Sequence, residues 1–240
     1  MRRDHRPYGA KRLHRALERA YVEHFFRPQL DRLGSDYQIM KPWNLRIHGA
    51  CIGFGESPHV VTTRDRPVTL TTWAYGDYQG HIDVGDYCLL CPGTRLDSGT
   101  SIQIGANTML AAGVYITDAD WHDIYDRTLP IGQTSPVVLG ENVWIGDSSI
   151  VCKGVTIGEN SVIGAGSVVT GDIPANVIAA GSPARVIKPL EADVPLRRRQ
   201  DLLADADRLN RQIDDLDRYL HSGNSWFNWL RSVVKPNSED

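Results

Sequence analysis

The sequence predicts a mainly β protein, built as a solenoid, with a helical segment at each end of the chain. Three observations predict this fold class. Aliphatic residues recur every six positions, and glycine and small or β-branched residues accompany them at fixed offsets. The composition also changes along the chain: both ends are rich in Arg, Leu and Ala, whereas the centre is rich in Gly, Val, Ile, Thr and Ser. A β-rich repeat between helical ends follows.

The period of six is clearest in the second half of the chain, at Leu139, Ile145, Val151, Ile157, Ile163 and Val169. It also runs through Val84, Leu90, Leu96 and Ile102, slips by two residues, and resumes at Ile104, Leu110 and Ile116. This period matches neither the 3.6 residues of an α-helix turn nor the alternation of a strand. It fits short strands joined by sharp bends, whose aliphatic side chains stack in columns. A β-sandwich is the alternative, but its strands would alternate and be separated every ~8–12 residues.

Composition and charge exclude several classes of function. The chain has 240 residues, of which 41% are apolar and 23% charged, as in globular proteins. A net charge of −3 gives no field that would attract nucleic acid. No run approaches the ~18 apolar residues of a membrane span, and the basic start lacks the apolar core of a secretory signal. We therefore expect a cytoplasmic protein with reduced cysteines and no nucleic-acid partner.

The segment from Val143 to Ile187, which begins Val-Trp-Ile-Gly-Asp and ends Gly-Ser-Pro-Ala-Arg-Val-Ile, carries a family resemblance. It resembles the hexapeptide-repeat acyltransferases, most of all the branch with the maltose, galactoside and nodulation-factor O-acetyltransferases. The resemblance is strong over 80–190, weak over 40–80, and does not cover the ends. It implies a left-handed parallel β-helix with three strands per coil. It also implies a homotrimer, with acetyl-CoA as co-substrate in the groove between neighbouring β-helices.

The chain then divides into three parts: a basic helical segment at 1–40, the β-helix at 41–189, and a helical extension at 190–240. The repeat is interrupted once, between Ile116 and Leu139, by a loop excursion at 117–136. Solenoids extrude insertions as loops, often on the binding face. In the resembled family a loop at this place carries a histidine general base, and His122 is the single histidine in the loop.

Transfer of an acetyl group from a thioester to a hydroxyl needs a base for the hydroxyl proton, and histidine titrates near neutral pH. The resemblance therefore implies that His122 is the base, and a nearby carboxylate would orient its ring. Asp120 and Asp118 are both candidates, and the sequence does not choose between them. The alternative is that His122 is a polar loop residue without a role in catalysis.

The resemblance also implies where CoA binds, on backbone and small side chains of the last coils with a basic residue at its phosphates. The matching positions are Trp144, Asp147, Ala165, Thr170, Arg185 and Lys188. Gly171 stands where the family usually has lysine, so Arg185, Lys188 or Lys153 would have to make that phosphate contact. For the Ala165 and Thr170 side chains, plain solenoid packing is the alternative.

The acceptor side matches the family poorly, because the family's acceptor-binding asparagine falls near Cys91 and no asparagine lies close. We expect an acetyl-CoA-dependent O-acetyltransferase that acts on a hydroxyl of a sugar, or of a polysaccharide or lipid-linked glycan precursor. An N-acetyltransferase on an amino sugar and a non-catalytic β-helix scaffold are the alternatives. No metal is expected, because a zinc site of three histidines would need paired loop histidines, and the Cys88/Cys91 pair has no second pair.

The C-terminal part contains apolar residues spaced 4, 3, 4, 3 and 4 apart, at Leu202, Ala206, Leu209, Ile213, Leu216 and Leu220. This heptad spacing predicts either a coiled coil or a helix packed on its own β-helix. The apolar segment 226–234, with Trp226, Phe227 and Trp229, follows it. It would either make a peripheral contact with the inner membrane face, together with N-terminal arginines, or cap apolar surface within the trimer.

Overall fold

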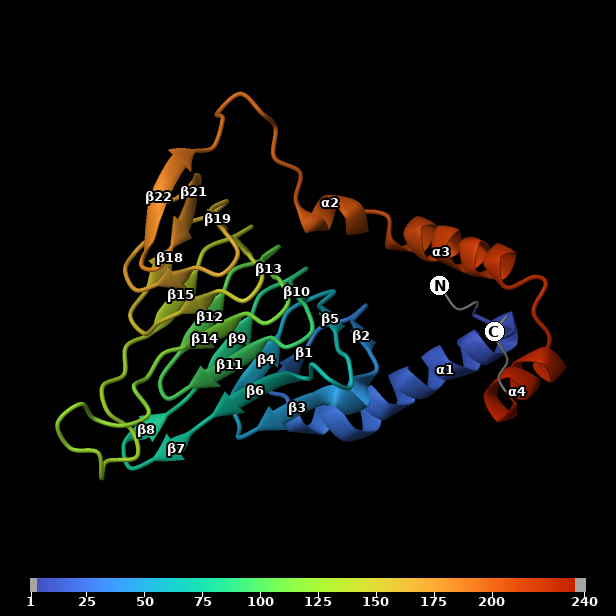
Figure 1. Ribbon diagram of the computed structural model, residues 1–240, viewed down its shortest axis with the longest axis horizontal. Helices are drawn as coiled ribbons and strands as arrows, with labels where there is room; N and C mark the ends of the chain where they lie inside the picture. The colour runs from blue at the N-terminus through green and yellow to red at the C-terminus, as the bar shows by residue number, and fades with distance from the viewer. Residues whose placement is uncertain (1–3, 236–240) are drawn as a thin grey trace. The chain divides into compact units, whose positions relative to one another are not determined.

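The computed structural model describes residues 4–235, apart from the side chains of 206 and 207, and consists of two compact units (Figure 1). Unit 1 combines the two ends, Met1–Ala20 and Gln200–Asp240, and unit 2 contains Tyr21–Arg199. The sequence analysis divides the chain at residues 40 and 189. The structure joins the two ends in one unit and starts the β-rich unit at Tyr21.

Unit 2 is a β-solenoid with three sheets, A, B and C, and successive strands along the chain belong to these sheets in turn. Sheet A contains β1 (Arg32–Leu33), β4 (Ile52–Phe54), β9 (Ile82–Val84), β12 (Ile102–Ile104), β15 (Val137–Leu139) and β18 (Thr156–Ile157). Sheet B contains β2 (Gln38–Met40), β5 (His59–Val61), β10 (Leu89–Leu90), β13 (Met109–Leu110), β16 (Trp144–Ile145), β19 (Val162–Ile163), β21 (Val177–Gly181) and β22 (Ala184–Pro189). Sheet C contains β3 (Leu45–His48), β6 (Val68–Thr72), β11 (Arg95–Ser98), β14 (Tyr115–Thr117), β17 (Ile150–Val151) and β20 (Val168–Val169).

The register of the parallel ladders follows the six-residue repeat. Trp144 pairs with Val162, and Ile150 with Val168, each 18 residues further along the chain, which is three repeats per coil. The two-residue slip in the sequence repeat corresponds to a coil that is two residues longer. In that coil Ile102 pairs with Ile82, which lies 20 residues earlier. The prediction of a parallel solenoid with three strands per coil is confirmed. The antiparallel pairs are β21 with β22, and β7 (Ala74–Tyr75) with β8 (Tyr78–Gln79).

The aliphatic residues of the repeat form one continuous core inside the three sheets. Ile145, Val151, Ile157, Ile163 and Val169 are fully buried. Each such side chain contributes about 1.5–3 kcal/mol by leaving water, so the column of aliphatic residues stabilises the stack of coils.

Cys88 occupies one of the small inward positions of the repeat and is fully buried. Burial raises the pKa of its thiol to about 12, and the thiol donates a hydrogen bond to the Gly105 carbonyl oxygen at 3.2 Å. The Cys-x-x-Cys spacing therefore reflects packing of the repeat.

The turns from sheet A to sheet B contain a ladder of asparagines. Asn142, Asn160 and Asn176 each have a left-handed backbone, with φ of 56°, 60° and 59°. Asparagine tolerates this conformation better than most residues. The Asn142 amide donates to the Asn160 side-chain oxygen at 3.1 Å, and the Asn160 amide donates to Asn176 at 2.8 Å. The ladder ties the corners of successive coils together.

The N-terminal segment is helical at first and then enters the solenoid. Helix α1 (Tyr8–Tyr21) continues into a π-helical turn, η1 (Val22–Phe26), and a 3-10 turn, η2 (Arg27–Gln29); a further 3-10 turn, η3 (Pro42–Asn44), precedes β3. Val22 and Phe26 are buried in the core cluster of unit 2. They add apolar side chains to this core before the first strand, β1, begins. Strands β1 and β2 lie within the range 1–40 that the sequence analysis assigns to a helical segment.

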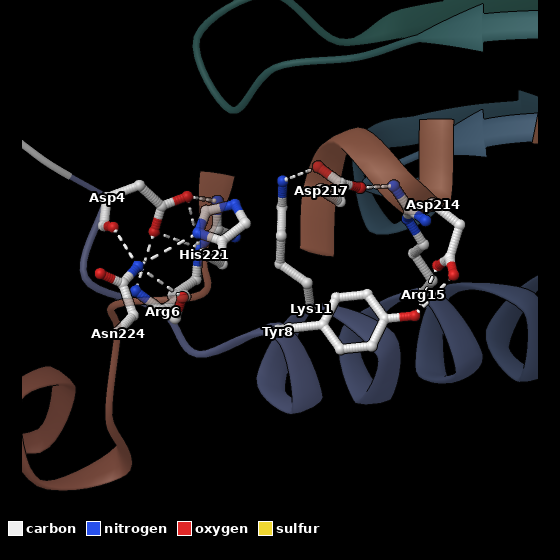
Figure 2. Close-up of polar contacts among 9 residues, drawn as sticks. All are labelled: Asp4, Arg6, Tyr8, Lys11, Arg15, Asp214, Asp217, His221 and Asn224. Carbon is white, nitrogen blue, oxygen red and sulfur yellow. Dashed lines mark hydrogen bonds and ion pairs between the residues drawn. The ribbon is translucent and has the colours of Figure 1, made fainter. Parts of the chain in front are cut away.

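The C-terminal helices are α2 (Arg199–Leu203), α3 (Ala206–Leu220) and α4 (Trp226–Val234). The heptad spacing predicts one helix from Leu202 to Leu220, but the structure breaks it. The Asp205 side chain accepts the Arg208 backbone N–H at 2.8 Å and caps the start of α3. Within unit 1, α3 pairs with α1 (Figure 2). None of the described helices is both long and apolar enough to cross a bilayer.

Candidate active site

The loop excursion leaves the solenoid after β14, at the corner between sheets C and A. A short backbone ladder closes its base: the Asp120 N–H donates to the Gln133 carbonyl at 2.9 Å, and the Gly132 N–H donates to the Asp120 carbonyl at 2.8 Å. The Ser135 N–H donates to the Asp118 carbonyl at 2.8 Å. These hydrogen bonds fix both ends of the loop on the solenoid.

His122 follows this ladder, and its side chain is exposed. Its Nδ1 lies 3.2 Å from the Leu129 carbonyl oxygen. Because a carbonyl oxygen can only accept, we assign the proton of the neutral ring to Nδ1, which leaves the lone pair on Nε2. Nε2 is then the atom that can take a proton from an acceptor.

Gly132 lets the two arms of the loop approach closely at His122. A Cβ at position 132 would lie 2.8 Å from the His122 carbonyl oxygen and 3.0 Å from the Asp123 Cα atom. Such contacts are shorter than real Cβ atoms accept, so the absence of a side chain at Gly132 sets the position of the His122 backbone.

Asp118 is fully buried at the base of the loop. Its carboxylate accepts hydrogen bonds from the Ser98 hydroxyl at 2.6 Å, the Gly99 N–H at 2.6 Å and the Thr100 N–H at 3.0 Å. All three donors lie at the corner of the preceding coil. Asp118 therefore anchors the loop to the solenoid.

Asp120 points to a different partner, since its two carboxylate oxygens lie 2.9 and 2.8 Å from the Lys153 Nζ. Among the described residues, no hydrogen bond or ion pair joins His122 to Asp118 or to Asp120. The His122 ring has the Leu129 carbonyl oxygen as its hydrogen-bond partner, where the sequence analysis expects an aspartate. A backbone acceptor carries no side-chain signal, so the sequence could not have pointed to it.

An aromatic cluster surrounds Trp121, the residue before His122. The Trp121 ring is 5.6 Å from the Trp73 ring, centroid to centroid, and its Nε1–H donates to the Tyr115 hydroxyl at 3.2 Å. Trp73 precedes the β7–β8 hairpin, which approaches the loop where the Tyr78 hydroxyl donates to the Gly132 carbonyl at 3.4 Å. Trp73 is 49% exposed. The sequence analysis missed this hairpin, because the repeat is weak before residue 80.

Arg95 and Asp97 extend the aromatic cluster along sheet C. The Arg95 guanidinium lies 4.7 Å from the Tyr115 ring centroid and forms an ion pair with Asp97. Asp97 is 3% exposed. Tyr115 thus contacts Trp121 of the loop through its hydroxyl and Arg95 through its ring, and Arg95 in turn pairs with the buried Asp97.

Most of the positions matched to CoA binding lie on sheet B or at the corner between sheets B and C. Trp144 is on β16 and 48% exposed, and Arg185 and Lys188 are on β22. Asp147 and Ala165 lie at the B–C corner of neighbouring coils, where the Asp147 side chain accepts the Ser148 hydroxyl at 2.6 Å. Thr170 instead follows β20, at the C–A corner that bears the loop. The structure thus places sheet C between His122 and most of the CoA positions.

Two segments of the chain match family models. Residues 136–171 match the bacterial transferase hexapeptide (six repeats), and residues 82–118 match the hexapeptide repeat of succinyl-transferase. Together with the 18-residue coils, these matches define a protein of the hexapeptide-repeat class. The chain therefore carries the hexapeptide repeat and is similar to the acyltransferases built on it.

Among its relatives, galactoside O-acetyltransferase of Escherichia coli K12 is 39% identical over 116 residues, which are 48% of this chain and 57% of that protein. The chain thus spans less than two thirds of this relative's length. Among solved structures, the N-acyltransferase AntD of Bacillus cereus, in complex with dTDP and 3-hydroxybutyryl-CoA, superposes with a TM-score of 0.57 at 20% identity, covering 79% of this chain and 95% of AntD. This second likeness shows the fold.

Proposed function

We propose that the chain transfers an acetyl group from acetyl-CoA to a hydroxyl of a sugar or glycan precursor, with His122 as the general base. The observation that carries the proposal is the His122 ring, exposed on an anchored loop with Nδ1 held by the Leu129 carbonyl oxygen. The matches to hexapeptide-repeat models and the relative named galactoside O-acetyltransferase support the choice of reaction and of a sugar acceptor.

The reaction follows from that geometry. Nε2 of His122 takes the hydroxyl proton while the acceptor oxygen attacks the thioester carbon. The tetrahedral intermediate collapses, the carbon–sulfur bond breaks, and the CoA thiolate leaves with the proton from the imidazolium. A base of this kind contributes about 10²–10⁴-fold in rate, and proximity of the two bound substrates supplies most of the remainder.

The split site supports assembly into a homotrimer. Within one chain, sheet C separates the loop corner from the B–C corner and sheet B, where Trp144, Ala165 and Arg185 lie. A second copy placed against sheet C would bring its CoA-binding positions to this chain's His122. The proposal therefore places the reaction between neighbouring copies. It also takes the coils to be left-handed, as the resemblance implies.

The aromatic cluster supports a sugar as acceptor. Trp121 precedes His122 in the loop, its ring lies 5.6 Å from the Trp73 ring, and Trp73 leaves about half of its surface open. Aromatic faces offer a large apolar area at low conformational cost, which suits the C–H face of a pyranose ring. The half-exposed Arg95 guanidinium, which lies against the Tyr115 ring, supplies donors for hydroxyls. A small aliphatic alcohol would use little of this surface.

The test is CoA thiol release from acetyl-CoA in the presence of a panel of glycosides and amino sugars. His122→Ala should lower acceptor-dependent release by about 10²-fold or more. Tyr125→Ala is the matched control, because Tyr125 lies in the same loop and is 96% exposed; its rate should equal that of the wild type.

Equal rates for His122→Ala and wild type would refute the histidine-base mechanism. Transfer only to amino groups would show that the acceptor is an amine and would favour the N-acetyltransferase. If calorimetry detects no CoA binding, the non-catalytic scaffold would be the remaining alternative.

A further inference from the structure

The turns that connect sheet B to sheet C lie in one line along the solenoid, because hydrogen bonds join each turn to the next. In the first coils, the Thr62 hydroxyl donates to the Lys41 carbonyl oxygen at 2.8 Å, and the Gly93 N–H donates to the Arg66 carbonyl oxygen at 3.2 Å. Backbone bonds continue the line from Gly113 to Pro92, from Ser148 to Ala112 and from Gly166 to Asp147, at 2.9, 2.8 and 2.7 Å. A ligand that follows this B–C corner therefore meets the turns in order.

The proposed function assigns the later and middle turns of the corner to the two substrates. The later turns carry Asp147 and Ala165, which the family resemblance matches to CoA binding. The family's acceptor-binding asparagine falls near Cys91, on the turn 91–94. That turn and the next, 111–114, contain no charged residue. The part of the acceptor that extends away from CoA would then meet the first turns of the corner.

Those first turns, 41–44 and 62–67, are basic. They contain Lys41, Arg64 and Arg66 and a single acid, Asp65, so their charge is 3 − 1 = +2 in a chain with a net charge of −3. Arg64 and Arg66 are exposed. Neither arginine forms an ion pair within the part of the chain that the structure describes. Their guanidinium groups are available to a ligand.

Arg199 adds a positive charge beside the middle turns. Its Nε–H donates to the Tyr87 carbonyl oxygen at 2.7 Å, and no described carboxylate pairs with it. Burial lowers the pKa of this half-buried guanidinium. Burial also raises the pKa of the Cys91 thiol, and the Arg199 charge opposes that rise. The positive field therefore reaches the turn where the family places its acceptor-binding asparagine.

We propose that the acceptor carries an anionic group, a phosphate or a carboxylate, which the basic turns 41–44 and 62–67 bind. The inference rests on the proposed function and adds the class of sugar. Guanidinium donors match the oxygens of either anion, and such charge-assisted hydrogen bonds are stronger than neutral ones. Neighbouring coils are about 5 Å apart, so these turns lie about 5–10 Å from the turn of Cys91. The anion is therefore on the acetylated sugar ring or on the next one.

The test measures CoA release by the full-length chain with methyl glycosides, 1-phosphates and uronic acids of galactose and glucose. Wild type should show a kcat/KM at least about 10-fold higher for a charged sugar than for its neutral methyl glycoside. The phosphates and the uronic acids distinguish the two anions. Arg66→Gln should raise the KM of the preferred charged sugar about 10-fold and leave the KM values of the methyl glycoside and of acetyl-CoA unchanged.

Arg32→Gln is the matched control. It also removes one positive charge, but Arg32 lies on sheet A, where it is 2.8 Å from Asp83. Its KM values should equal those of the wild type.

Equal kcat/KM for neutral and charged sugars, or an unchanged KM of the charged sugar in Arg66→Gln, would overturn the anionic acceptor and leave the transfer reaction standing. Release with none of the sugars would count against the proposed function itself. Calorimetry with galactose 1-phosphate then tests the basic turns alone: binding that Arg66→Gln weakens about 10-fold supports an anion site, and absence of binding overturns it.

Discussion

Replacement of Asp118 by alanine tests whether this carboxylate anchors the loop or acts on His122. The change removes the acceptor of three hydrogen bonds from the preceding coil. The Ser98 hydroxyl keeps a second acceptor, the His81 carbonyl oxygen at 3.0 Å. The backbone N–H groups of Gly99 and Thr100 lose theirs.

The magnitude follows from those two N–H groups. A buried donor left without an acceptor costs about 1–3 kcal/mol, so Asp118→Ala should lower the free energy of unfolding by about 2–6 kcal/mol. Asp118→Asn keeps one side-chain oxygen, which can still accept one of the two backbone N–H groups, while its amide faces the other. About half of that loss in the free energy of unfolding is therefore expected. Urea unfolding followed by far-ultraviolet circular dichroism measures both values.

Activity then separates the two roles. Because Asp118 contacts the solenoid corner, Asp118→Asn should leave the pH profile of kcat/KM at the wild-type position. Asp126→Ala is the matched control, since Asp126 lies in the exposed part of the same loop and accepts hydrogen bonds from Thr128; its unfolding midpoint should not change. An unchanged midpoint for Asp118→Ala, or a displaced pH profile for Asp118→Asn, would refute the anchoring role.

Three further perturbations probe the loop, the acceptor side and unit 1. Gly132→Ala should displace the His122 backbone and lower kcat about 10–100-fold with an unchanged urea midpoint, because misplacement near 1 Å has that effect; an unchanged kcat would contradict the packing argument. Trp73→Ala should raise the acceptor KM about 10-fold and leave the acetyl-CoA KM unchanged, whereas Trp73→Phe should retain most affinity; parallel changes in both KM values would argue against a sugar platform. Burial alone would raise the pKa of Asp217, but the hydrogen bond from Lys11 and the nearby cationic charges lower it below the usual value. The resulting stability is present above the unfolded pKa, near 4, and is lost as the pH falls further, so the helical circular dichroism at 222 nm should decline below about pH 4 before the β signal does.

The sequence predicts the solenoid well where the repeat is strict. From β15 to β20 every aliphatic residue of the period faces the core, since the spacing of six leaves one inward position per strand. The repeat weakens before residue 80, and strands β1 and β2 and the Trp73 hairpin were not foreseen. Register in that region depends on contacts between coils, which no local pattern reports.

The candidate site was predicted in part. The interruption of the repeat located the loop and singled out His122, but the roles of its aspartates depend on folding. The sequence does not distinguish Asp118 from Asp120. In the structure, Asp118 is buried and accepts the Gly99 N–H of the solenoid, whereas Asp120 forms an ion pair with Lys153. The heptad spacing of α3 likewise could not reveal that α1 would pair with its acidic side.

The C–A corner has a consequence for engineering. Both the 73–80 hairpin and the 117–136 loop leave the solenoid there, and the coils on either side keep their pairing. The hairpin turns at Gly76, which has φ of 58° and nothing within 4 Å of its Cβ position. Foreign sequence spliced in at this turn, such as an epitope tag or a fluorophore-labelling peptide, should be carried outside the ladders. The corner therefore offers a graft point from which reporters, or loops borrowed from other proteins, could be displayed without redesign of the scaffold.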